Sequence, residues 1–283
     1  MVHQRKTGFV QRPDAAIYYE AVGSGPGLVF GHGLGGNHMS WWQQVAHFAD
    51  RFTCVSFAHR GFTPSRVEPG GAGRAEGSAS AAGVEAYADD LTALADHLGL
   101  ETFAMVCQSM GGWTGIDFAI RSPERLRALV LASTSGRIDF RTIEGPELAE
   151  VQSWEKHAAA AREALPRENI HVAGGARMAR EQPALHLLYQ EIDALTPPEW
   201  KATIRQQLFA LRTTPAVRLR QLRVPTLWIV GNEDIVFPAA AAAPLARLMP
   251  KAEVAHVADA GHSVYFERPR RFNELVEGFL SSI

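Results

Sequence analysis

A serine near the middle of the chain lies where a strand pattern changes abruptly into a helix pattern. The apolar run 102–107 predicts a strand, the pattern 113–121 predicts a helix, and Ser109 stands at the corner between them. Such a turn forces an unfavourable backbone on the serine and lifts its hydroxyl off the sheet edge, toward the positive end of the following helix. A serine held in this way can be activated as a nucleophile. An ordinary strand-to-helix connection explains the motif equally well if it is taken alone.

A serine nucleophile needs a base and an acid that orients the base, and both residue types follow later strand patterns. His262 lies in the loop between the last predicted strand and the last predicted helix. Asp234 follows the strand pattern 226–230, and its neighbour Glu233 is the alternative acid, although its position favours solvent. Each of these residues also has a simpler interpretation, because turn acids cap helices and loop histidines bind the backbone. We predict that Asp234 and His262 serve Ser109, in the order serine, acid, histidine.

An acyl-transfer site also needs hydrogen-bond donors for the negative charge that develops on the substrate oxygen. The backbone N–H of Met110, next to the serine, is predicted to be one donor. The second is predicted to be the N–H of Leu34, in the glycine-rich loop His32-Gly33-Leu34-Gly35-Gly36. We expect His32 to be structural and to bind this loop. The loop is not a phosphate-binding loop, because the G-x-x-x-x-G-K-[ST] pattern is absent.

Strand and helix patterns alternate along most of the chain, which predicts a mostly parallel sheet with helices on both faces. The predicted strands are 15–21, 28–30, 52–57, 103–107, 126–132, 226–230 and 254–257, and the helices beside them are 41–48, 84–98, 112–121 and 272–280. Active sites in such sheets lie outside the carboxyl ends of the strands. The candidate residues above all fall at such ends.

Two segments interrupt the alternation. Residues 67–83 are rich in Gly, Ala and Ser and are predicted to form a mobile surface loop. Residues 134–224 show only helical patterns, at 148–164, 176–181, 185–192 and 199–211. We predict that 134–224 is a helical cap (lid) inserted into a core of 1–133 and 225–283, since it is too long for one crossover connection.

Taken together, these motifs resemble those of the α/β-hydrolases over nearly the whole chain. The resemblance rests on His32-Gly33-Leu34-Gly35, Arg60-Gly61, Gln108-Ser109-Met110-Gly111-Gly112, Gly231-Asn232-Glu233-Asp234 and Gly261-His262. It implies an α/β-hydrolase fold, with a mostly parallel eight-stranded sheet, helices on both faces and an inserted helical cap. It also implies a catalytic triad of Ser109, Asp234 and His262, in the chain order of that family.

The chain departs from the family pattern at three positions. Cys107 stands where the elbow usually has its first glycine, and it is small enough for the position. Ala58 and Thr63 replace an aspartate and a glycine of the segment after the fourth strand in relatives. Arg60 therefore lacks its usual local partner. The altered turn could also let His59 reach the substrate pocket, although we expect a structural role for this histidine.

The serine at the elbow argues against haloalkane dehalogenases and epoxide hydrolases, which use aspartate there. We expect a serine hydrolase that cleaves a small, largely apolar carboxylic ester or lactone through an acyl-enzyme. The elbow resembles those of enol-lactonases and of meta-cleavage-product C–C hydrolases. The latter usually carry a tryptophan shortly after the histidine, where this chain has Ser263-Val264-Tyr265-Phe266. C–C hydrolysis, a non-hydrolytic elimination or cyclisation, and a ligand-binding receptor remain alternatives.

The substrate pocket is expected to be apolar. The candidate substrate-binding residues are Trp113, Trp41, Phe237, Val264 and Tyr189, and packing in the core is the alternative for each aromatic one. The arginines that could bind a substrate carboxylate are Arg137, Arg177, Arg180 and Arg205, and nothing in the sequence ranks them.

Composition excludes several classes of partner. The 283 residues include 28 basic and 30 acidic ones, a net charge of −2, which indicates neither nucleic acid nor an anionic membrane as partner. Two cysteines in strand-like segments, an N-terminus without an apolar signal core and no long apolar stretch favour a cytoplasmic protein. The excess of arginine over lysine and the abundant alanine favour a bacterial source. No spacing of His, Cys or carboxylates suggests a metal, and no cofactor is implied. We expect a small-molecule substrate and leave a homodimer open.

Overall fold

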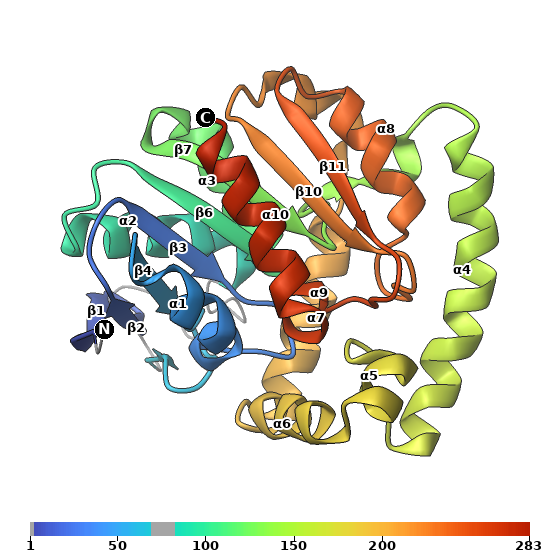
Figure 1. The fold of residues 1–283 in the computed structure, drawn as a ribbon, viewed down its shortest axis with the longest axis horizontal. Coiled ribbons are helices and arrows are strands. Elements are labelled where there is room, and N and C mark those ends of the chain that lie inside the picture. The colour runs from blue at the N-terminus through green and yellow to red at the C-terminus, as the bar shows by residue number, and fades with distance from the viewer. Residues whose placement is uncertain (1–2, 69–82) are drawn as a thin grey trace, which may run out of the picture.

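A central sheet organises the chain, whose computed structural model describes residues 3–68 and 83–283 (Figure 1). Its nine strands within these residues are β1 (Arg5–Arg12), β2 (Ala15–Val22), β3 (Gly27–Gly31), β4 (Thr53–Phe57), β5 (Arg66–Val67), β6 (Phe103–Gln108), β7 (Leu126–Ala132), β10 (Thr226–Gly231) and β11 (Ala252–Val257). Eight of them follow the order β1-β2-β4-β3-β6-β7-β10-β11, and the short β5 pairs with β2. From β4 to β11 the neighbours are parallel, whereas β1 and β2 are antiparallel. The mostly parallel eight-stranded sheet is confirmed, with β5 in addition.

The strand β1 has no counterpart among the predicted strands. It forms an edge of the sheet, and Val10 is its one buried residue. A strand with so little buried surface lacks the apolar alternation by which strands are predicted.

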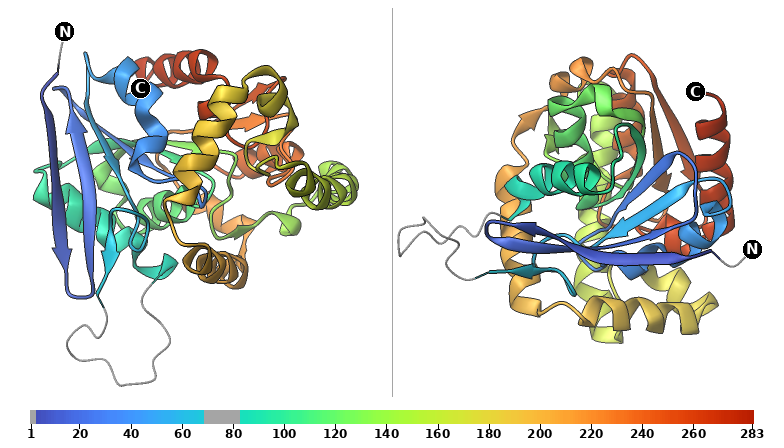
Figure 2. Two further views of the ribbon diagram at one scale, coloured as in Figure 1. Left: turned by 90° about the horizontal axis from the view of Figure 1, so that it is seen from below. Right: turned by 90° about the vertical axis from the view of Figure 1, so that its left-hand side faces the viewer.

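Helices cover both faces of the sheet, as predicted (Figures 1 and 2). The helices on one face are α1 (Trp42–Phe48), α9 (Val264–Glu267) and α10 (Pro269–Ser281); those on the other are α2 (Tyr87–His97), α3 (Gly111–Arg121) and α8 (Ala242–Arg247). Each layer encloses its own hydrophobic cluster against the sheet. No helix within the described ranges is both long and apolar enough to cross a membrane.

The segment between β7 and β10 holds four further α-helices. They are α4 (Glu147–Ala164), α5 (Gly175–Glu181), α6 (Pro183–Ala194) and α7 (Pro198–Leu211). In Figure 1, α5, α6 and α7 lie beyond the carboxyl ends of the strands and α4 runs along one side. No strand was expected in this segment, but β8 (Ile138–Asp139) and β9 (Thr214–Pro215) pair in parallel near its two ends. Two residues are too few to show a strand pattern in the sequence.

The loop predicted at 67–83 is only partly described. Its first residue belongs to β5, and residues 69–82 lie outside the described residues. The helix predicted at 84–98 begins as a 3₁₀ turn, Val84–Ala86, and continues as α2.

Candidate active site

Ser109 occupies the sharp turn between β6 and α3. Its φ of 48° lies in the left-handed region, which is unfavourable for a residue with a Cβ. The turn is held from both sides, because the Ser109 N–H donates to Ala132 O over 3.0 Å and its carbonyl accepts from Gly112 N over 2.9 Å. The hydroxyl therefore lies at the carboxyl edge of the sheet, beside the first turn of α3 and its positive dipole end.

Two glycines of α3 make this elbow possible. A Cβ on Gly111 would overlap the carbonyl oxygen of Gly31, so only glycine lets α3 approach β3 this closely. A Cβ on Gly115 would lie 2.5 Å from the Sγ of Cys107. The side chain of Cys107, at the position where relatives usually have glycine, thus occupies space that Gly115 leaves free.

The residues predicted as acid and base lie in contact. The Nδ1 of His262 is 2.9 Å from Oδ2 of Asp234, and both side chains are buried. The other carboxylate oxygen, Oδ1, accepts from the N–H groups of Val236 at 2.7 Å and Phe237 at 2.9 Å. These three contacts fix the carboxylate, and because a carboxylate oxygen can only accept, Nδ1 of His262 is the donor in this pair.

The rival acid, Glu233, faces away from the histidine. Its carboxylate is half-exposed and pairs with Arg177, whose Nε lies 3.0 and 2.9 Å from its two oxygens. Arg177 also binds Glu181 at 2.7 Å. The structure therefore brings Asp234 to His262 and engages Glu233 with Arg177 instead.

The loop that carries His262 is anchored by a residue that sequence reasoning missed. The buried carboxylate of Glu267 accepts from the N–H groups of Gly261 at 2.8 Å and Ser263 at 3.0 Å, one on each side of the histidine. Gln108 Nε2 donates to the carbonyl of His262 over 3.3 Å. Burial, the largest cause, raises the pKa of Glu267 to about 7. The only sequence signal for this contact was the position of Glu267, an acid in the short helix that directly follows His262.

The two predicted oxyanion donors lie at neighbouring strand ends. Leu34 follows β3 and lines the cavity described below, while Met110 lies between Ser109 and the first residue of α3. Within the part of the chain that the structure describes, neither backbone N–H donates to a protein acceptor. Both groups are therefore free to bind a substrate oxygen.

Two buried histidines support the loop after β3. The Nδ1 of His32 donates to Gly33 O at 2.7 Å, and its Nε2 accepts from the backbone N–H of His59 at 2.9 Å. The His59 ring itself contacts His32 and, at 2.8 Å, the Oγ1 of Thr114. Burial lowers the pKa of His32 to about 3 and that of His59 well below its ordinary value, so both rings are neutral at neutral pH. Neither lines the cavity, which agrees with the structural roles expected for them.

Arg60 has partners from distant parts of the sequence. Its guanidinium binds both oxygens of Asp90 in α2 at 2.7 Å each, and Nη1 binds Asp14 at 3.0 Å. The loss of the local aspartate at position 58 is therefore compensated by acids that sequence spacing could not pair with Arg60.

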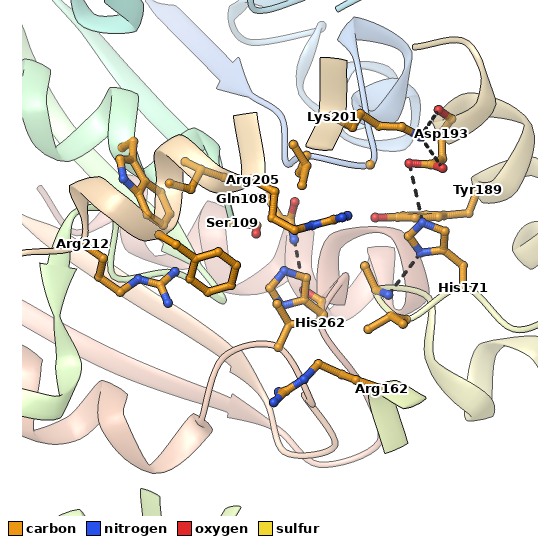
Figure 3. Close-up of a pocket in the computed structure, with 18 residues that line it drawn as sticks. Gln108, Ser109, Arg162, His171, Tyr189, Asp193, Lys201, Arg205, Arg212 and His262 are labelled. Carbon is orange, nitrogen blue, oxygen red and sulfur yellow. Dashed lines mark hydrogen bonds and ion pairs between the residues drawn. The ribbon is translucent and has the colours of Figure 1, made fainter. Parts of the chain in front are cut away.

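A cavity of about 270 Å³ opens between Ser109, His262 and the segment 134–224 (Figure 3). Trp113 and Tyr189 line it, as predicted. The other three predicted pocket residues, Trp41, Phe237 and Val264, do not line it; they are buried in the hydrophobic core. Both aromatic residues of this group pack on other rings. The ring centroids of Trp41 and Tyr265 are 4.3 Å apart, and those of Phe237 and Trp228 are 6.5 Å apart.

The segment 134–224 contacts the loops that carry the acid and the histidine. Trp154 of α4 donates from Nε1 to the carbonyl of Asp234 over 2.6 Å, and Arg162 donates to Ile235 O over 2.6 Å. Tyr189 of α6 accepts from the hydroxyl of Ser263 at 3.1 Å. In residues 3–68 and 83–283, no three His, Cys, Asp or Glu side chains group as metal ligands would.

Comparison with known proteins places this chain in a family. The family model described as "alpha/beta hydrolase fold" matches residues 26–269. The chain belongs to the α/β-hydrolases. A relative in Rhizobium rhizogenes, provisionally named carbamate hydrolase RutD, is 28% identical over 280 residues, which cover 96% of this chain and 95% of the relative. The 3-oxoadipate enol-lactonase 2 of Acinetobacter baylyi is 27% identical and aligns over 94% of each chain.

Solved α/β-hydrolases have the same fold. An esterase of Thermogutta terrifontis, determined with malate bound, aligns with a TM-score of 0.72 and 25% identity over 99% of this chain and 98% of its own. The enzyme Est816, which degrades N-acyl homoserine lactones, aligns with a TM-score of 0.74 and 24% identity over 96% of this chain and all of its own. This protein is therefore an α/β-hydrolase enzyme with hydrolases, esterases and lactonases among its relatives.

Proposed function

We propose that Ser109, His262 and Asp234 form a catalytic triad that hydrolyses a carboxylic ester or lactone through an acyl-enzyme. The observation that carries this proposal is the position of His262. Its imidazole is held by Asp234 through Nδ1, and it lines the same cavity as Ser109 on its strained turn. Ester and lactone chemistry needs no group beyond these and two oxyanion donors.

In the first half of the reaction, Oγ of Ser109 attacks the substrate carbonyl as Nε2 of His262 takes its proton. The carboxylate of Asp234 stabilises the imidazolium that forms. The N–H groups of Leu34 and Met110 donate to the oxyanion, and the N-terminal end of α3 adds its dipole. When the tetrahedral intermediate collapses, His262 gives the proton to the leaving oxygen and the acyl group stays on Ser109.

In the second half, water repeats the same steps. His262 takes a proton from the water as its oxygen attacks the acyl carbonyl, and it returns that proton to Oγ of Ser109. The acid is released and the enzyme is restored, with no redox change or cofactor in the balance.

We further propose that residues 134–224 act as the cap of this site, on a core formed by 1–133 and 225–283. Support comes from the hydrogen bonds of Trp154 and Arg162 to the loop of Asp234, and from the cap residues that line the cavity. The cavity volume lies just below the ~300–1,000 Å³ usual for ligand pockets, which favours a small substrate.

The test is release of 4-nitrophenol from acyl esters of graded chain length, together with hydrolysis of simple lactones. Ser109→Ala should lower kcat by ~10⁴-fold or more. Ser133→Ala is the matched control, because Ser133 also has a positive φ, of 49°, and its buried hydroxyl has no hydrogen-bond partner among the described residues. This control should keep near-wild-type turnover. Equal turnover by Ser109→Ala, or no turnover of esters or lactones by the folded wild type, would refute the proposal.

A further inference from the structure

One face of α7 carries cationic side chains into the cavity. Lys201, Arg205 and Leu208 follow each other at intervals of four and three residues, which places them on one side of α7, and Arg212 comes directly after the last residue of the helix, Leu211. All four line the cavity, and α4 adds Arg162. Among the described residues that line the cavity, the charged side chains other than histidines are four cations, Arg162, Lys201, Arg205 and Arg212, and one carboxylate, Asp193.

Two of the four cations already have anionic partners. The Nζ of Lys201 binds Asp193 at 2.7 Å, and Asp193 also lies 3.6 Å from Nε2 of His171. Arg162 pairs with Glu155 at 2.7 Å in addition to its bond to the loop of the acid. The single carboxylate of the cavity is therefore engaged at the end where α6 meets α7.

Among the described residues, neither Arg205 nor Arg212 forms such an ion pair, although Asp139 attracts Arg212 electrostatically from beyond 4.0 Å. Within residues 3–68 and 83–283, neither guanidinium has a carboxylate within 4.0 Å or a hydrogen-bond acceptor. In Figure 3, Arg205 extends toward the middle of the cavity, and Arg212 lies on the side away from His171. An Arg side chain without an acceptor in a lined cavity can offer its full fork of donors to a ligand.

The surroundings of Arg212 make the lack of an acceptor unusual. Its Nε is buried without a partner, and its guanidinium lies 5.2 Å from the ring of Trp113, 5.4 Å from that of Phe140 and 5.8 Å from that of Phe209. Burial lowers the pKa of Arg212 to about 10, so the group remains charged at neutral pH. Buried donors are normally satisfied, and a charged one left open costs the folded protein free energy unless a ligand completes it.

We propose that Arg205 and Arg212 form an anion-binding subsite, so that the ester or lactone substrate carries a carboxylate. This rests on the proposed function, because it places the scissile carbonyl at Ser109 in the same cavity. The planar guanidinium matches a carboxylate with two parallel hydrogen bonds, and the aromatic rings around Arg212 pack against the carbon chain next to it. The substrate is thus an anionic ester or lactone rather than the largely apolar one expected from the sequence.

The test compares three chromogenic esters with the same six-carbon acyl chain. In 4-nitrophenyl hexanoate the chain is neutral, and in the mono-4-nitrophenyl ester of adipic acid it ends in a carboxylate. In 5-hexanoyloxy-2-nitrobenzoate the carboxylate is on the leaving group instead. Wild type should show a kcat/KM for one of the two anionic esters ~10-fold or more above that for the neutral ester.

Arg205→Gln and Arg212→Gln should each reduce this preference by ~10- to 100-fold, the range expected when one charge-assisted hydrogen bond is lost. Arg218→Gln is the control, because Arg218 is an exposed arginine that does not line the cavity. It should keep the preference. If Arg212→Gln fails to fold, Arg205→Gln decides alone, since its side chain is exposed.

The subsite is refuted if both anionic esters react no faster than the neutral one, or if the preference survives both arginine substitutions. A binding measurement separates this from failure of the proposed function. Calorimetric titration of Ser109→Ala with adipate, and with hexanamide for comparison, needs no turnover. Adipate should bind ~10-fold or more tightly than hexanamide, and Arg205→Gln in the same background should remove the difference. Equal binding would refute the subsite even if all esters are hydrolysed.

Discussion

The substitution Asp234→Asn tests the proposed triad at a single atom. The asparagine keeps the shape of the side chain, and its Oδ1 can still accept from the N–H groups of Val236 and Phe237. The amide NH₂ then faces the Nδ1 of His262, which is 2.9 Å from Oδ2 in the wild type. A donor at that point makes Nδ1 the acceptor and moves the ring proton to Nε2. The atom that should take the proton of Ser109 is then already protonated.

The expected loss follows from the role of that tautomer. In serine proteases the same aspartate-to-asparagine change lowers kcat by about 10⁴-fold, which corresponds to about 5 kcal/mol of transition-state stabilisation. The fold should lose much less. The two backbone hydrogen bonds to Oδ1 persist but are no longer charge-assisted, which costs about 1 kcal/mol each. We therefore expect kcat to fall by ~10⁴-fold while the melting temperature falls by a few degrees.

Steady-state hydrolysis of a 4-nitrophenyl ester measures kcat, and calorimetric unfolding measures the melting temperature. Glu233→Gln is the matched control, because its carboxylate is adjacent in sequence but pairs with Arg177. We expect it to change kcat less than ~3-fold. The reasoning fails if Asp234→Asn retains more than a tenth of wild-type kcat in a folded protein, or if Glu233→Gln is the more damaging change.

Two further predictions concern buried groups around the site. Because burial raises the folded-state pKa of Glu267 from 4.5 to about 7, its contribution to stability is full below pH 4.5 and is lost as pH rises through 7. Wild type should therefore lose about 3 kcal/mol of unfolding free energy, relative to Glu267→Gln, between pH 4 and pH 8 in urea titrations. Gly115→Ala should place a methyl group against Cys107 and cost about 1–3 kcal/mol of packing energy. Cys107→Ala should recover it, giving a coupling of at least about 1 kcal/mol in a double-mutant cycle.

Each of these has a clear contrary result. A parallel pH dependence of stability in wild type and Glu267→Gln would mean that this carboxylate titrates alike in the folded and unfolded states. Additive effects of Gly115→Ala and Cys107→Ala would mean that the helix adjusts without regard to the sulfur. In that case the glycine does not explain how the elbow accommodates Cys107.

The central strands and the order of the proposed triad could be predicted from sequence because their signals are local. A buried parallel strand appears as a short apolar run, and the residues after it fall at one edge of the sheet by topology alone. Ser109, Asp234 and His262 each follow such a run, so parallel strands in one sheet were enough to bring all three to the same edge. The edge strand β1 gave no such signal, since Val10 is its one buried residue.

Contacts between distant residues had no comparable signal. The pairing of Arg60 with Asp90 joins a loop after β4 to α2, and the anchoring of the histidine loop by Glu267 depends on the turn into α9. The residues that line the cavity were the least predictable from the sequence. Trp41 and Phe237 are as apolar as Trp113, and only packing decided that the first two lie in the core and the third at the cavity.

The residue types of the proposed triad were thus determined by the sequence, whereas the side chains that line the cavity were decided by the tertiary structure. The strand ends bring the proposed catalytic side chains to one edge of the sheet independently of residues 134–224, because the sheet topology fixes their positions. The cavity is the space left between two packed layers, so its charge depends on which face of α7 turns inward and on which cations already have partners. Arg205 could be named from the sequence, but only the structure shows that it lines the cavity without an ion pair among the described residues, while Lys201 pairs with Asp193.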